Sequence, residues 1–155
     1  MRLEEVVKVE QFRNDSQRAI INLYYTNSVI SGQFKALLKP AGLTPQQFNI
    51  LRILNGQYPE PARIGLVKER MIDRNSDMTR LVERLVSKGL IERTVCEEDR
   101  RQQHVKITEK GRSMLHTIKA KVDRFENASQ QLSDKELDVL NQLLDKLREV
   151  YEPEP

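Results

Sequence analysis

The sequence predicts a mainly α-helical protein that contains one small β-hairpin. Apolar residues recur at helical spacing over most of the 155 residues. Glycine and proline residues interrupt this spacing at a few points. Two short segments past the middle of the chain alternate apolar with polar side chains, which is typical of a hairpin. At this length we expect one compact domain, residues 1–155, with enough chain to bury a core.

The N-terminal part of the chain is expected to form one long helix. From about Val9 to Leu38 the apolar residues keep a helical spacing despite Gly32, and Lys39-Pro40-Ala41-Gly42 then ends the helix. A second helix is predicted from Thr44-Pro45-Gln46-Gln47, which combines a capping hydroxyl, a proline at the first helical position and a capping-box glutamine. It continues to Gly56.

A short helix is predicted from about Ala62 to Met71, and a more strongly patterned one follows it. In the latter, Met78, Leu81, Val82 and Leu85 form one apolar stripe at helical spacing, and Gly89 ends the helix. Three residues could each cap its start, and the sequence does not choose among them: Asp73, Asn75 and Ser76.

A β-hairpin follows this helix. Ile91–Val95 and His104–Ile107 both alternate apolar with polar residues. Between them, residues 96–103 contain no apolar side chain except that of Cys96, so this charged tip cannot belong to a core. A helix next to a basic-tipped hairpin can occupy one groove of DNA while the tip occupies the next. Nucleic acid is therefore the first partner to consider.

Two further helices complete the chain. Thr108 can cap the first of them, and Gly111 in its first turn can allow close approach of a neighbouring element. Ser133 and Glu136 form a capping box for the last helix, whose apolar residues lie on one stripe. Such a stripe must bury against something, either a partner subunit or the chain's own core.

The basic surplus of the chain lies in its central part. The net charge is +3, from 26 Lys and Arg against 23 Asp and Glu. Residues 63–112 contain 13 of these basic and 9 of these acidic residues, a charge of +4, which leaves 13 against 14, or −1, for the rest. A value of +4 is modest, but it coincides with the segment predicted to contact nucleic acid.

Several function classes are disfavoured. No apolar run approaches a membrane span, the first residues lack the apolar core of a secretion signal, and one cysteine fits a reducing compartment, so we expect a cytoplasmic protein. His104 and His116 lie in no cluster with metal-ligand spacing. A metal site formed by Cys96 and His104 would have too few ligands. No phosphate-binding loop or metalloprotease motif is present. We therefore expect no enzyme, no metal and no cofactor.

Three stretches together resemble the winged-helix signature of the MarR family of bacterial transcription regulators. They are Leu81–Ile91, Asp99-Arg100-Arg101 and Val105–Gly111. The resemblance extends over the chain in length and helix order, with its motifs concentrated between Leu43 and Arg112. It implies a winged helix-turn-helix at about 43–110, dimerisation helices at about 1–39 and 110–151, and a homodimeric repressor. It also implies a pseudo-palindromic double-stranded operator and control by a small ligand or an oxidant.

In a helix-turn-helix, the N-terminal half of the second helix contacts base edges in the major groove. The residues that we predict to contact DNA from this region are Arg74, Asn75, Ser76, Thr79, Arg80 and Arg84. In the family's wing pattern an aspartate orients an arginine that enters the minor groove, which maps onto Asp99 and Arg101, with Arg100 nearer a phosphate. The alternative is that these arginines are solvated side chains that offset nearby acids.

Two further sets of residues are expected from the architecture. The predicted dimer contacts are Val7 and Phe12 near the N-terminus and Leu140, Leu143, Leu144 and Leu147 in the last helix. A small-molecule effector of unidentified chemistry is expected between the winged helix and the dimer helices, where Tyr24, Tyr25, Phe34 and Phe48 are candidate lining residues, although aromatics at helical spacing are more often ordinary core.

Two other functions are weighed against this one. The same fold could serve as a protein-interaction module, in which the wing binds another protein. Cys96 could make the protein redox-responsive, but it lies away from the family's known peroxide-sensing position near the start of the first helix, so a plain strand cysteine is favoured.

Overall fold

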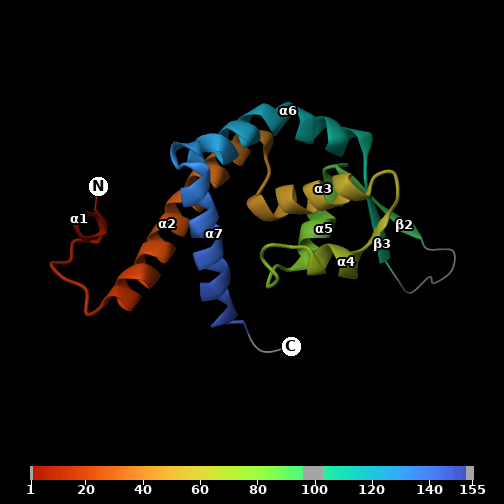
Figure 1. Cartoon of the computed structure of the whole chain (residues 1–155). Helices are drawn as coiled ribbons and strands as arrows, with labels where there is room; N and C mark the ends of the chain where they lie inside the picture. Colours follow the sequence, from red (N-terminus) through yellow and green to blue (C-terminus); the bar gives the residue numbers. More distant parts are fainter. Residues whose placement is uncertain (1, 96–102, 153–155) are drawn as a thin grey trace. The chain divides into compact units, whose positions relative to one another are not determined.

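The computed structural model describes residues 2–95 and 103–152 of the chain (Figure 1). The chain divides into two compact units, one that extends to Ile118 and one that begins at Lys119. The division falls within a long helix. Within the described residues, no helix is long and apolar enough to cross a membrane.

The first unit begins with two helices instead of the one predicted from Val9. Helix α1 spans Leu3–Val7, and α2 spans Asp15–Leu38. The prediction of a single start was wrong because Asn14 caps α2, where its side chain accepts a hydrogen bond from the N–H of Gln17 at 2.8 Å. The pKa of Glu4 in α1 is lowered, first by a backbone hydrogen bond and also by the neighbouring Arg18.

Helix α3, Pro45–Gln57, begins as predicted. The Thr44 side chain accepts from the N–H of Gln47, and the Gln47 side chain accepts from the N–H of Thr44. A short 3-10 turn, η1 (Lys39–Ala41), and Gly42 with a φ of 65° precede it. Four large apolar side chains of α3 form part of the core: Phe48, Ile50, Leu51 and Leu54.

The short helix predicted from about Ala62 to Met71 is present but is shorter than predicted. Ala62–Arg63 form a strand, β1, and the helix α4 spans only Ile64–Glu69. Ala62 pairs with Val105 of β3 (Gln103–Ile107), so the first two residues of the predicted helix form a strand instead. Helix α5 spans Met78–Ser87 and is capped by Asp77, which was not among the three predicted caps.

The predicted hairpin is present as β2, Ile91–Val95, and β3, Gln103–Ile107. The three strands pair antiparallel in the order β1-β3-β2, with Ile91 opposite Ile107 and Arg93 opposite Val105. Ile91, Val105 and Ile107 are buried. Helices α3, α4 and α5 lie together beside this sheet (Figure 1). The fold is therefore mainly α-helical with a small sheet, as the sequence predicts.

Helix α6 spans Glu109–Glu126 and passes from the first unit into the second. A 3-10 turn, η2 (Asn127–Gln131), leads to α7, Asp134–Glu149, with the predicted capping box of Ser133 and Glu136. The pKa of Glu136 is lowered because its carboxylate accepts hydrogen bonds from the backbone N–H and then from the hydroxyl of Ser133. None of the residues of α7 is buried.

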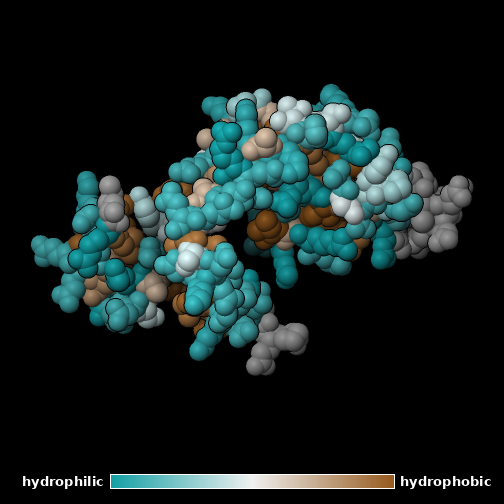
Figure 2. All heavy atoms as spheres, turned by 45° about the horizontal axis from the view of Figure 1, so that its top comes forward, coloured by the Kyte–Doolittle hydropathy of each residue, from teal (hydrophilic) through white to brown (hydrophobic). Residues whose placement is uncertain are grey.

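On the face of the molecule that Figure 2 shows, most side chains are hydrophilic, and hydrophobic side chains are visible mainly between them. This agrees with a mean hydropathy of −0.62 and with 32% charged residues. Where exposed apolar side chains gather on one element, they are informative about contacts with other molecules.

Candidate nucleic-acid interface

Helix α5 has one buried and one exposed side. Met78, Val82 and Leu85 are buried, and Val82 and Leu85 are no more than 1% exposed. On the other side Thr79, Arg80, Glu83 and Arg84 are exposed, as the helical spacing predicts. Because the apolar stripe packs into the chain's own core, the exposed polar side of α5 is available for an external partner.

Three of the predicted contact residues precede the helix instead of lying in its first half. Arg74, Asn75 and Ser76 form a turn before the cap, and Arg74 and Asn75 are exposed while Ser76 is half-buried. Asp73 organises this turn, because it accepts from the N–H of Asn75 through its side chain at 3.2 Å and from the N–H of Ser76 through its carbonyl at 3.3 Å. The turn therefore presents Arg74 and Asn75 beside the start of α5.

Asp77 lies at the start of α5, where its negative charge would repel DNA phosphates, but it has a structural role. The Asp77 carboxylate accepts a hydrogen bond from the N–H of Arg80 at 3.1 Å and so caps α5. A carboxylate at a helix N-terminus is stabilised by the N–H groups and by the helix dipole. Its negative charge is thus engaged with the helix itself, while the Arg80 residue is exposed to solvent.

The C-terminal end of α5 is held by three long-range contacts. The Lys88 ammonium donates to the carbonyl of Gly42, and the Lys110 ammonium donates to the carbonyl of Lys88. The Thr108 hydroxyl donates to the carbonyl of Gly89 at 2.7 Å. These contacts fix α5 against the start of α3 and the start of α6.

Gly111 makes a close approach at the same place, as expected from the sequence. A Cβ atom at Gly111 would lie 2.2 Å from the carbonyl oxygen of Leu90. The first turn of α6 can therefore pack directly on the backbone that links α5 to β2. Thr108 caps this turn by accepting from the N–H of Gly111 at 3.1 Å.

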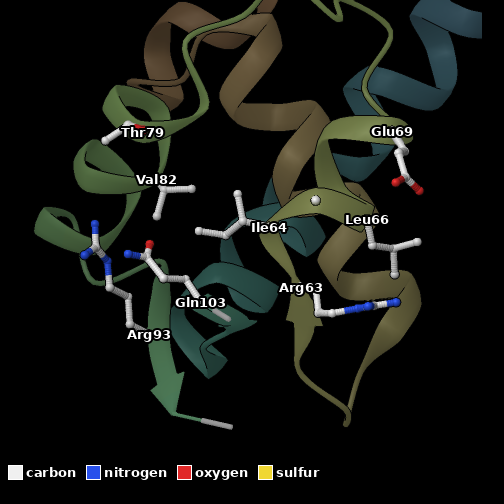
Figure 3. A pocket seen from close by; sticks show the side chains of 9 residues that line it. Arg63, Ile64, Leu66, Glu69, Thr79, Val82, Arg93 and Gln103 are labelled. Carbon is white, nitrogen blue, oxygen red and sulfur yellow. The ribbon is translucent and has the colours of Figure 1, made fainter. Parts of the chain in front are cut away.

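A cavity of about 490 Å³ opens between α4, α5 and the sheet (Figure 3). Ile64 and Val82 supply apolar surface, and Arg63 and Arg93 contribute guanidinium groups from β1 and β2. Thr79 of α5 also lines it. Neither arginine was predicted from the sequence as part of a site. Arg63 reaches the sheet only because β1 pairs with β3, and Arg93 lies in a strand that was predicted without a binding role. Glu69 also lines the cavity, so two guanidinium groups and one carboxylate surround its apolar residues, which suits a small polar molecule.

The predicted wing residues Asp99, Arg100 and Arg101, together with Cys96, lie outside the described residues. The strands that lead to them are paired up to Val95 and Gln103. Among the described residues, no group of three or more His, Cys, Asp or Glu side chains could hold a metal ion.

The predicted effector residues are brought together only in part. Phe34 of α2 and Phe48 of α3 pack edge to face, with ring centroids 5.4 Å apart. Tyr24 and Tyr25 are exposed on α2. An aromatic contact that the sequence did not predict joins α6 to the residue directly after α3, where the Arg112 guanidinium lies 4.0 Å from the ring centroid of Tyr58.

The predicted dimer residues are incompletely covered within the chain. Val7 ends α1 and Phe12 lies between α1 and α2, and both are half-buried. In α7, Leu140 is 43%, Leu143 60% and Leu144 37% exposed, while Leu147 is half-buried.

A family model matches the central part of the chain. The model of the MarR family matches residues 43–102, which contain α3, β1, α4, α5 and β2. Over these residues the chain is similar to the MarR family. This match and the fold of MarR-family structures agree with the resemblance seen in Leu81–Ile91 and Val105–Gly111.

Solved MarR-family structures match almost the whole chain. A MarR transcription factor from Planctomyces limnophilus is 29% identical, with a TM-score of 0.67, over 87% of this chain and 98% of that one. CouR from Rhodococcus jostii, solved with p-coumaroyl-CoA, is 26% identical, with a TM-score of 0.71, over 93% and 99%. A mutant MarR from E. coli, solved with operator DNA, is 23% identical, with a TM-score of 0.75, over 89% and 99%.

Proposed function

We propose that this protein is a MarR-type, sequence-specific DNA-binding transcription regulator, a homodimeric repressor whose operator affinity is set by a small molecule. The observation that carries the proposal is the exposure of one side of α5. Its apolar side is buried in the core of the chain, while Thr79, Arg80 and Arg84 remain exposed. A helix presented in this way fits the major groove. The fold is also that of the E. coli MarR solved with operator DNA.

Each contact residue is assigned a role by its chemistry. Arg80 has a planar fork that can pair with O6 and N7 of guanine, and Asn75 can pair with adenine. Ser76 and Thr79 suit phosphate or water-mediated contacts, and Arg74 and Arg84 suit phosphates on either side. In the wing, Arg101 would enter the minor groove while Asp99 orients it and Arg100 lies near a phosphate.

The domain organisation follows from these roles. We assign DNA binding to about residues 43–110 and dimerisation to the helices at about 1–39 and 110–151. In a homodimer on a pseudo-palindrome, the two copies of α5 must lie one helical turn of DNA apart, about 34–36 Å. A cytoplasmic regulator without catalytic activity fits these assignments.

The effector would act by changing that separation. A ligand shifts the equilibrium only if it binds the DNA-competent and DNA-incompetent dimers with different affinity. The relative CouR was solved bound to p-coumaroyl-CoA, which supports a small-molecule effector. Two places in this chain are candidates: the region of Tyr24, Tyr25, Phe34 and Phe48, and the cavity beside Arg63 and Arg93. Equal ligand affinity with and without operator would exclude this mechanism.

The experiment that tests DNA recognition starts from a random pool. Bound duplexes are selected with the full chain, and the affinity for the selected site is measured at several salt concentrations. We expect an inverted repeat, poor competition by random DNA and a steep fall in affinity as salt rises. Arg80→Ala should lower the affinity about 10- to 100-fold.

The matched control is Arg124→Ala, which removes an exposed arginine of α6 outside the predicted DNA contacts. It should leave the affinity unchanged. If no sequence is selected, or if both arginine variants behave alike, the proposal is wrong. A protein-interaction module would show neither sequence selection nor this salt dependence. Peroxide that leaves operator binding unchanged would exclude a redox role for Cys96.

A further inference from the structure

Ile72 is an apolar residue with no packing role in its own chain. The residue is 91% exposed, the largest value among the exposed large hydrophobic residues that the structure describes. Met71, directly before it, is 3% exposed and belongs to the core. Single exposed apolar side chains are common on protein surfaces, so exposure makes Ile72 available to a partner, and its fixed backbone and its neighbours indicate which partner.

The main chain of Ile72 is held in place. Its N–H donates to the Oδ1 atom of Asn49 on α3 at 3.0 Å, and Met71 anchors the residue before it. On the other side, Asp73 organises the turn through its hydrogen bonds to Asn75 and Ser76. The backbone at Ile72 is therefore fixed at both ends, and the exposed side chain is presented in a defined place beside the start of α5.

The neighbourhood indicates what this side chain would contact. Arg74 and Arg80 are exposed on the same turn and helix, while the carboxylates of Asp73 and Asp77 accept hydrogen bonds from backbone N–H groups. A surface that exposes arginine side chains suits DNA better than an apolar protein partner. The C5-methyl group of thymine is the apolar group that the bases present in the major groove.

We propose that Ile72 is a specificity-determining residue that contacts a thymine methyl group at the edge of each operator half-site. The inference rests on the proposed function, since it requires α5 to occupy the major groove. It extends the recognition surface from α5 back into the turn before it, and it adds an apolar selection for thymine to the polar contacts of Arg80 and Asn75.

The test removes only the methyl group from the DNA. Once the operator has been selected with the wild-type chain, each thymine is replaced in turn by uracil, at the same position in both half-sites. At the contacted position we expect about a fourfold loss of affinity per half-site, and about 15-fold for both, from the apolar surface of one methyl group. Replacement at the other positions should change little.

Ile72→Ala should bind the thymine operator about as weakly as the wild-type chain binds the uracil operator, and it should no longer distinguish the two. Ile72→Val should keep part of the discrimination. Arg80→Ala should lower the affinity for both operators while keeping the wild-type ratio between them. Because Ile72 is exposed, the unfolding midpoint of Ile72→Ala should equal that of the wild-type chain, which separates a binding effect from a folding effect.

The outcomes are distinct. Selective binding without any effect of uracil, or an Ile72→Ala variant that keeps the wild-type ratio, overturns this inference and leaves the proposed function standing. The second result would mean that another residue contacts the thymine methyl group. Failure to select any sequence overturns the proposed function and the inference together.

Discussion

Helices α5 and α7 are both well capped and both amphipathic, yet they use their apolar residues differently. In α5, Met78, Val82 and Leu85 are buried within the chain. In α7, which is longer, none of the residues is buried, and Val139 and Leu143 are more than half exposed. The apolar side of α5 is thus buried within the chain, whereas the apolar side of α7 remains exposed to solvent.

This difference separates two kinds of binding surface. The exposed side of α5 is polar and carries arginines, so it is stable in water. It can therefore bind DNA and dissociate again without any change in the fold. The exposed side of α7 is apolar, and burial of such a surface is favourable by about 25 cal/mol per Å². We therefore propose a permanent partner for α7, a second copy of the chain, and a reversible partner for α5.

The largest effect is expected from breaking the apolar side of α7. Leu140→Asp together with Leu143→Asp should weaken the dimer at least about 100-fold, because each leucine contributes about 1.5–3 kcal/mol when buried. Sedimentation should show monomers at micromolar concentration, and operator binding should fall with it. Glu149→Gln, an exposed residue on the opposite side of α7, is the control and should remain dimeric. A wild-type chain that sediments as a monomer would contradict the assignment of α7.

The next effect concerns the packing that positions α5. Gly111→Ala should lower the free energy of unfolding by about 1–3 kcal/mol, because the added Cβ would overlap the carbonyl oxygen of Leu90. Gly32→Ala in α2 is the control, since a Cβ there meets nothing within 4 Å. That control should be neutral or stabilise by up to about 1 kcal/mol. Equal denaturant midpoints for the two variants would show that the close approach is not needed.

A smaller effect is expected at the wing. Arg101→Ala should lower the affinity for many DNA sequences, and the slope of log affinity against log salt should become shallower by about one, because one cation no longer neutralises the DNA backbone. Titrations at four or five salt concentrations measure this slope. An unchanged slope would remove Arg101 from the interface and leave α5 as the main DNA-binding element.

The smallest effect is expected at the cap of α5. Asp77→Ala should lower the free energy of unfolding by about 1 kcal/mol, because the N–H of Arg80 would have no side-chain acceptor. Asp77→Asn is the control and should cost only a few tenths of this, since asparagine caps almost as well. If both variants instead raised DNA affinity equally without any decrease in stability, the carboxylate would act on the DNA and not on the helix.

Local interactions determined most of the fold. The caps at Thr44 and Ser133 act within four residues, and the apolar stripes of α5 and α7 and the alternation in β2 and β3 are regular over a few turns or residues. The same regularity predicts that Arg80 and Arg84 are exposed. These features are visible in the sequence because the groups that interact are close together along it.

Contacts between distant residues decided the rest, and no local pattern indicates them. Ala62 and Arg63 form strand β1 because Val105 and His104 of β3 pair with them. This pairing shortens α4 and brings Arg63 to the sheet. Asp77 becomes the cap of α5 because Asp73 is used by the preceding turn. Ile72 is exposed because Asn49 holds its backbone while Met71 enters the core. Packing of elements far apart in the chain sets each of these, so the sequence determined which elements form, and the tertiary structure determined which side chains reach a partner.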